Sequence, residues 1–219
     1  MNDDSVLVAC PTYSGLADCL DEYLKAFHAF SYEDKSLLLV DNTKDGGAYA
    51  RDLAFKATTR HVTPRKTFQE TFGLCWKEIL SHAEENGFRW VFSLEQDVIC
   101  DHPLTIDTLL NIAGYVKAPF VTHTYPYHWG VNKLYQGLGC TLILTGLLRE
   151  AMDDFDVEGL VEGSIYKLAQ RTSHVSLTGL FPIRHLDGQN RYWQYADETD
   201  PRVEYPKEYE ALGKRDPRK

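Results

Sequence analysis

The feature that most constrains the fold is residues 90–98, where an apolar run ends in two carboxylates, Glu95 and Asp97. The run itself mixes aromatic, β-branched and aliphatic side chains, which is typical of a strand covered on both faces. Because burying an unpaired charge is costly, both acids are expected just past the carboxyl end of this strand. Ligands of open α/β sheets bind at such ends. A solvated acidic turn is the alternative interpretation.

If the chain stays extended beyond the strand, Glu95 and Asp97 point to the same side, since side chains alternate along an extended backbone. Two oxygen ligands that face one way suit Mg²⁺ or Mn²⁺. The stretch therefore predicts a divalent-metal site at the edge of a sheet.

The surrounding pattern predicts an α/β fold with a central, mostly parallel sheet flanked by helices. A strand at 6–10, a helix at 16–30 and a strand at 37–40 form a βαβ unit, which implies parallel strands and a right-handed crossover. A helix at 68–86 is expected to begin with a capping box formed by Thr67 and Glu70. Further helices are predicted at 48–57, 105–113, 146–152 and 161–170, and further strands at 61–63, 120–124, 141–144 and 175–183.

We predict one domain over residues 1–195. From residue 196 to residue 219, charge and proline dominate and the periodicity disappears, so this segment is interpreted as a charged C-terminal tail.

Three strand ends carry polar residues: Pro11 to Tyr13, Asp41, and the acids of residues 95–97. Parallel neighbours bring these ends to one edge, so the groups are expected to share a cleft. No GxGxxG motif follows the first strand and no GxxxxGK[ST] motif occurs, which argues against a dinucleotide site or a P-loop. A metal held by carboxylates could bind a diphosphate instead.

Composition narrows the class of protein further. A net charge of −9 without a basic cluster argues against a dedicated duplex-binding surface. The five cysteines lack CxxC spacing and are interpreted as small buried hydrophobes in a reducing compartment. The chain starts without a secretory signal pattern, and no apolar run reaches the length of a membrane span. These features predict a cytoplasmic location.

Five segments together resemble the nucleotide-sugar glycosyltransferases of the GT-A fold, close to their large family-2-like group. The resemblance covers roughly residues 6–188, and its segments in chain order are VLVACPTY, LLVDN, VFSLEQDV, GLGCTL and IRHL. It implies a single-domain GT-A fold. It also implies a metal-dependent transfer of a sugar from a nucleoside-diphosphate sugar to an acceptor hydroxyl, with inversion.

The resemblance assigns roles around the metal. Glu95 and Asp97 match the first and last positions of the family's DxD motif. The last acid usually binds Mn²⁺ or Mg²⁺, and the first lies near the ribose or the sugar. Here Glu95 replaces the usual aspartate. His185 matches a late histidine that ligates the metal, and an imidazole, a carboxylate and two phosphate oxygens form an ordinary Mn²⁺ environment. The alternative for His185 is a surface histidine in a loop.

The resemblance also implies which residues bind the nucleoside. Pro11, Thr12 and Tyr13 match a loop that packs against the nucleoside, and Asp41 matches the acid that hydrogen-bonds the base. The alternative for Asp41 is a turn former or helix cap.

The general base is less sharply defined. The family carries a Glu-Asp pair at the start of a helix, and this pair is missing here. Glu162 is the first candidate to deprotonate the acceptor and Glu158 the second, while either could only complement a helix amino terminus. The aromatic loop at 125–135, including Trp129, is expected beside the cleft, where aromatic rings stack on sugars or bases.

Two other functions stay open. A nucleotidyltransferase of the same broad fold usually carries a glycine-rich loop with Arg and Lys after the first strand, which residues 11–15 lack. A catalytically inactive nucleotide-sugar-binding module is favoured by the missing Glu-Asp pair. The acceptor (a saccharide, a protein or modified DNA), the sugar and the base are not defined by the sequence.

Overall fold

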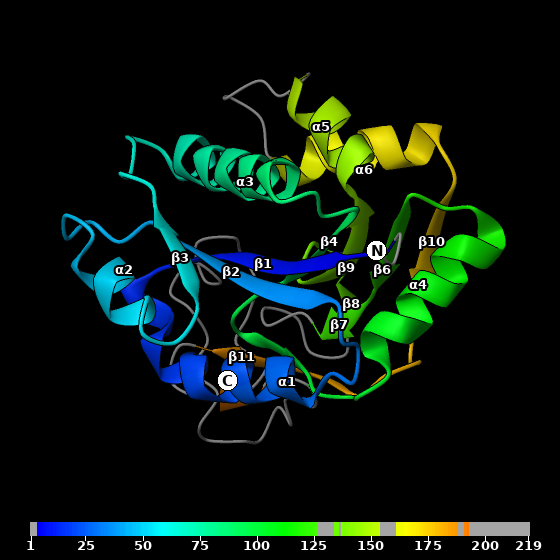
Figure 1. Cartoon of the computed structure of the whole chain (residues 1–219), viewed down its shortest axis with the longest axis horizontal. Helices are drawn as coiled ribbons and strands as arrows, with labels where there is room; N and C mark the ends of the chain where they lie inside the picture. The colour runs from blue at the N-terminus through cyan, green and yellow to red at the C-terminus, as the bar shows by residue number, and fades with distance from the viewer. Residues whose placement is uncertain (1–3, 127–133, 136, 154–160, 188–190, 193–219) are drawn as a thin grey trace, which may run out of the picture.

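A seven-stranded sheet lies between two layers of helices in the computed structural model, which describes residues 4–126, 134–135, 137–153, 161–187 and 191–192 (Figure 1). The strand order is β10-β6-β9-β4-β1-β2-β3. Strand β9 is antiparallel to β4 and β6, and the other neighbouring pairs are parallel. The predicted mostly parallel α/β sheet is therefore confirmed. Its strands are β1 (Val6–Thr12), β2 (Lys35–Asp41), β3 (Thr58–His61), β4 (Trp90–Leu94), β6 (Phe120–His123), β9 (Cys140–Leu144) and β10 (His174–Leu177).

Each face of the sheet has its own apolar core. Along β1, Val6, Val8 and Cys10 face one core, whereas Leu7 and Ala9 face the other. Helices α1 (Leu20–Ala29) and α4 (Thr105–Val116) cover the first face. The second face is covered by α3 (Phe68–Glu85), α5 (Thr145–Asp153) and α6 (Val161–Arg171). Burial on both faces explains why these strands are nearly continuous in apolar residues.

Local signals set the limits of α3 as predicted. The Thr67 hydroxyl accepts a hydrogen bond from the Glu70 N–H, and the Glu70 carboxylate accepts one from the Thr67 N–H. After Asn86, Gly87 has a φ of 71°, in the left-handed region that glycine tolerates best. The five cysteines are free and buried, again as predicted.

The first strand runs two residues further than predicted. Pro11 cannot donate to a neighbouring strand, but β4 pairs only with Val6 to Ala9, so no partner is lost there. The predicted helix at 16–30 is divided into a 3₁₀ helix, η1 (Ser14–Cys19), and α1.

The stretch 175–183, predicted to hold a strand, contains most of β10 and only the first residue of the next strand, which belongs to another sheet. Gly179, with a φ of 70°, and Pro182 interrupt it. Strand β11 (Ile183–Asp187) joins a small sheet of order β12-β11-β5, with β5 (Val98–Cys100) and β12 (Arg191–Tyr192).

The shorter elements are α2 (Ala48–Leu53), β7 (Tyr125–Pro126) and β8 (Leu134–Tyr135). Among the helices that the structure describes, none combines the length and apolarity needed to cross a bilayer. The predicted tail at 196–219 lies outside the described residues, so the domain boundary at 195 stays a prediction.

Candidate functional site

Three neighbouring parallel strands, β2, β1 and β4, end at one edge of the sheet, as predicted. Thr12 and Asp41 are opposite each other in the β1–β2 register, and the Asn42 N–H donates to the Thr12 carbonyl at 2.9 Å. The Thr12 hydroxyl donates to the side-chain oxygen of Gln96, just past β4. Thr12 is only 1% exposed, so its side chain supports the edge from inside the protein.

Residues 95–97 form a turn between β4 and β5. The Val98 N–H donates to the Glu95 carbonyl at 2.9 Å, and the Glu95 N–H donates to the Gly139 carbonyl at 3.2 Å. The prediction that Glu95 and Asp97 point to the same side assumed that the chain stays extended beyond the strand. The turn shows that the chain is not extended here. Even so, Glu95 and Asp97 are both partly exposed and Gln96 between them is fully buried. Both acids therefore lie just past the strand, as predicted.

Asp97 and His185 are in contact. The Nε2 atom of His185 lies 3.3 Å from Oδ2 of Asp97, with side-chain exposures of 3% and 23%. The contact arises because β11 pairs antiparallel with β5, which places His185 opposite Val98. The Leu186 N–H also donates to the Asp97 carbonyl at 2.6 Å. The interpretation of His185 as a surface histidine in a loop is therefore wrong, since it is buried on a strand.

The Asp97–His185 pair fits a divalent cation with an incomplete set of protein ligands. Ligands about 2.1 Å from an octahedral ion are roughly 3 Å apart when they are at right angles, close to the observed 3.3 Å. Among the described residues, no group of three or more His, Cys, Asp or Glu side chains could hold a metal. Substrate oxygens and water would complete the coordination, as is usual for Mg²⁺. The metal itself stays a prediction.

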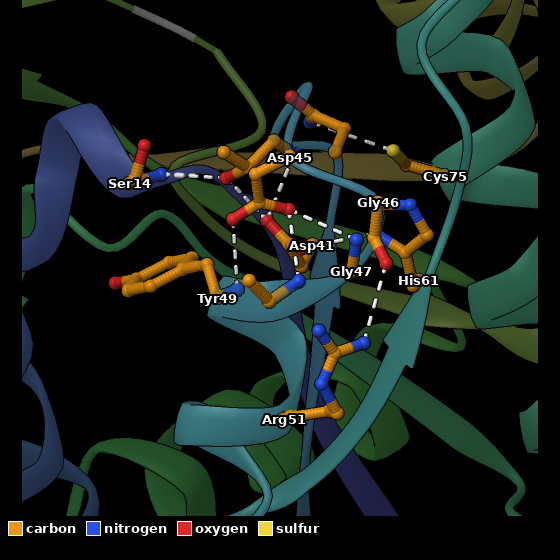
Figure 2. Close-up of polar contacts among 12 residues, drawn as sticks. Ser14, Asp41, Asp45, Gly46, Gly47, Tyr49, Arg51, His61 and Cys75 are labelled. Carbon is orange, nitrogen blue, oxygen red and sulfur yellow. Dashed lines mark hydrogen bonds and ion pairs between the residues drawn. The ribbon is translucent and has the colours of Figure 1, made fainter.

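Asp41 is fully buried, and protein groups contact both of its carboxylate oxygens (Figure 2). Oδ1 accepts from the Thr43 N–H at 2.9 Å and from the Thr43 hydroxyl at 2.6 Å, and Oδ2 lies 3.0 Å from Nδ1 of His61. In the contact between Asp41 and His61, the Asp41 side chain is fully buried and the His61 side chain is 24% exposed. The sequence did not predict a role for His61. Its contact with Asp41 depends on the register between β2 and β3, which places the two residues opposite each other.

The loop after β2 folds against His61 (Figure 2). Asp45 accepts hydrogen bonds from the N–H groups of Gly47, Ala48 and Tyr49 at 2.8–3.0 Å and so caps α2. Desolvation opposes ionisation, but these donors and His61 lower the pKa of Asp45. Gly47 has a φ of 78°, and a Cβ there would lie 3.5 Å from the His61 ring. The positive φ therefore favours glycine at this turn, whereas the distance to the ring is one that a Cβ would tolerate.

Tyr13 lies on the exposed side of the edge, with 47% of its surface accessible. Its ring folds over Gly15, where a Cβ would lie 2.2 Å from a ring carbon. Partial burial and then the negative charge of Asp97 raise the pKa of Tyr13. Tyr13 is thus a half-exposed aromatic side chain in the electrostatic field of Asp97.

The remaining predicted residues are placed only in part. Pro11 is partly buried at the end of β1. Glu162 belongs to the first turn of α6. Glu158 and Trp129 lie outside the described residues.

No protein-family model and no curated protein matches the chain. Solved structures do resemble it in fold. The mannosyltransferase PcManGT from Pyrobaculum calidifontis, in complex with GDP-Man and Mn²⁺, aligns with a TM-score of 0.62 and 16% identity, over 80% of this chain and 55% of that one. S. aureus TarS aligns with a TM-score of 0.58 and 12% identity, over 80% of this chain and 35% of TarS.

A cytidylyltransferase from Leptospira borgpetersenii also aligns, with a TM-score of 0.58 and 10% identity, over 81% of this chain and 77% of that one. The chain thus spans about a third to a half of TarS and PcManGT. Together with the sheet order, these likenesses show that the chain has a GT-A-like nucleotide-sugar transferase fold, which glycosyltransferases and nucleotidyltransferases share.

Proposed function

We propose that the chain is a metal-dependent glycosyltransferase that moves a sugar from a nucleoside-diphosphate sugar to an acceptor hydroxyl, with inversion. The observation that carries the proposal is the contact between Asp97 and His185 at the edge where three parallel strands end. A fold neighbour in complex with GDP-Man and Mn²⁺ supports it.

In this proposal, Asp97 and His185 would hold Mn²⁺ or Mg²⁺ beside the diphosphate of the donor. The bound ion would supply Lewis-acid stabilisation of the charge on the leaving nucleoside diphosphate. The protein's part is to hold both ligands in place beforehand. His185 is fixed within the β5–β11 ladder and Asp97 within a hydrogen-bonded turn, so little reorganisation accompanies donor binding.

The nucleoside is proposed to lie along the other half of the edge. Tyr13 offers an exposed aromatic face and Pro11 an apolar contact. Asp41 is fully buried with both carboxylate oxygens bonded to protein groups, so it is assigned to the base only through His61, whose side chain is 24% exposed. Glu95, at the head of the turn, is assigned to the ribose or the sugar. These assignments follow the order of the strands, since β2 and β4 flank β1.

Glu162 is proposed as the general base and Glu158 as the second candidate. The carboxylate takes the proton of the acceptor hydroxyl as its oxygen forms a bond to the anomeric carbon. The bond from that carbon to the diphosphate oxygen breaks on the opposite face of the sugar. Trp129 is assigned to the acceptor side.

A nucleotidyltransferase is the second candidate, because the chain covers 77% of a cytidylyltransferase but only 35% of TarS. Its reaction needs positive charge around a triphosphate. Residues 13–24, which run from the end of β1 to the middle of α1, contain no Lys or Arg but three acids, Asp18, Asp21 and Glu22. This charge pattern favours the glycosyltransferase.

Product analysis separates the two candidates. The chain is incubated with Mn²⁺ and UDP-, GDP- or CDP-sugars, and release of nucleoside diphosphate is measured. In parallel, nucleoside triphosphates and sugar 1-phosphates are supplied, and release of pyrophosphate is measured. Diphosphate release that stops on chelation supports the proposal, whereas pyrophosphate release alone would refute it.

A thermal-shift assay adds a test that does not need the acceptor. A ligand present at about 100 times its Kd stabilises the folded state by roughly 2.7 kcal/mol. We expect stabilisation by one nucleoside diphosphate only when Mn²⁺ is also present.

A further inference from the structure

Gln96 lies between the two acids of the metal-site turn, yet its own side chain is fully buried. Its amide joins two other segments. The side-chain oxygen accepts a hydrogen bond from the Thr12 hydroxyl at the end of β1, and Nε2 donates to the Leu16 carbonyl in η1 at 2.7 Å. One buried amide therefore ties the turn to the strand end and to the segment that follows Tyr13.

The backbone of the turn is held on either side of Gln96. The Glu95 N–H donates to Gly139, the Val98 N–H closes the turn on Glu95, and the Asp97 carbonyl accepts from Leu186. The side chain of Gln96 adds the attachment at the middle of the turn. Asp97 is the next residue along this turn.

We propose that Gln96 is a positioning residue, which fixes the Asp97 carboxylate beside His185 and couples it to the strand end at Thr12. The coupling continues to the nucleoside side, since Thr12 is opposite Asp41 and its carbonyl accepts from the Asn42 N–H. The inference rests on the proposed function, because its consequence is the geometry of the metal site. Gln96 itself contacts neither metal nor substrate in this scheme.

A positioning role differs measurably from a merely structural one. A structural residue changes the stability of the fold but leaves the metal affinity of the folded protein unchanged. A residue that orients a metal ligand changes the affinity itself, typically about 10- to 100-fold. The readout is therefore the Kd for Mn²⁺ with a nucleoside diphosphate present, measured by electron paramagnetic resonance of free Mn²⁺ below the melting temperature.

The decisive variant is Gln96→Met, which keeps the length of the side chain and removes both hydrogen bonds. Thr12→Val removes only the bond to the Gln96 oxygen, and Thr12→Ser keeps the hydroxyl. Gln69→Met, on a partly exposed position of α3, is the matched control for the same chemical change elsewhere.

We expect the Kd for Mn²⁺ to rise about tenfold or more in Gln96→Met and about threefold in Thr12→Val. Thr12→Ser, which keeps the hydroxyl, should change the Kd less than Thr12→Val does, and Gln69→Met should stay near the unaltered chain. Thr12→Val provides the test if Gln96→Met does not fold. Unchanged affinity in the folded Gln96 or Thr12→Val variant, with normal Mn²⁺ binding by the unaltered chain, would overturn this inference alone. Lack of nucleotide-dependent Mn²⁺ binding by the unaltered chain would overturn the proposed function and this inference with it.

Discussion

His185 Nε2 lies 3.3 Å from Asp97 Oδ2, although the two residues are 88 positions apart in the chain. The pairing of β11 with β5 produces this contact, and the two strands belong to a small sheet beside the main one. The pair proposed to bind the metal therefore comes from the turn after β4 and from strand β11 of the small sheet.

Removing either member of this pair should abolish turnover. Asp97→Ala and His185→Ala are each expected to eliminate detectable sugar transfer, and Asp97→Ala should also remove the Mn²⁺ dependence of donor binding. Isothermal titration with nucleoside diphosphate, with and without Mn²⁺, measures the second effect. Asp21→Asn is the control, because Asp21 is 88% exposed and its ion pair with Lys56 is of the kind that contributes little. Normal donor hydrolysis by Asp97→Ala would contradict the metal role.

Gly15→Ala should weaken nucleotide binding without a large loss of stability. The new methyl group would meet the Tyr13 ring at 2.2 Å, and the ring, on a half-exposed side chain, can swing away from its position. The Kd for the nucleoside diphosphate is expected to rise several-fold. Gly114→Ala in α4 is the matched control, since nothing lies within 4 Å of the added atom. Equal nucleotide affinity in the two variants would argue against a ligand contact at Tyr13.

His61→Ala should destabilise the fold through Asp41. The substitution leaves Oδ2 of a fully buried carboxylate without its partner, a loss that typically costs about 1–3 kcal/mol. Urea unfolding measures the change, and His28→Ala, at an exposed position of α1, is the comparison. A free energy of unfolding within roughly 0.5 kcal/mol of the unaltered chain would show that the pair contributes little.

Stability should fall as the pH drops below about 6.5 because of His123. Its Nδ1 donates to the Thr124 carbonyl at 2.6 Å, and its Nε2 accepts from the N–H groups of Leu180 and Phe181 at 3.0 and 3.2 Å. This arrangement requires a neutral ring, and burial lowers the pKa of His123 from 6.5. Between the lowered pKa of the folded state and about 6.5, the unfolded state binds more protons than the folded state. The free energy of unfolding therefore decreases as the pH falls through this range.

His123→Gln isolates this contribution, because a glutamine does not titrate. The free energy of unfolding is measured in urea above and below about pH 6.5, the usual pKa of histidine. The drop on acidification should be smaller in the variant than in the unaltered chain. An identical drop would assign the acid sensitivity to other groups, such as His82, whose pKa is also lowered by burial.

The parts of the fold that depend on local patterns were predictable from the sequence. The strand at Trp90–Leu94 is apolar and ends in acids, and α3 begins with a capping box, so both could be recognised without tertiary information. The edge shared by Thr12 and Asp41 followed from the βαβ order.

The parts that depend on distant pairing were not predictable from local patterns, and His185 was expected near Asp97 only through the family resemblance. Residues 183–187 include Arg184, His185 and Asp187, and nothing in five residues indicates that the middle one is buried against β5. The same applies to His61, which the β2–β3 register brings to Asp41, and to Gln96, whose position between two acids suggests solvent exposure.

Strand β9 has a consequence for how such a chain can change. It runs against its neighbours, so its first residue, Cys140, is beside Leu94 at the edge where the parallel strands end. The chain at Gly139 therefore enters the sheet at that edge, whereas Asp41 belongs to β2, Asp97 to the turn after β4 and His185 to β11. If the acceptor binds against residues 125–135 as proposed, substitutions there would alter acceptor choice and leave the residues assigned to the donor in place.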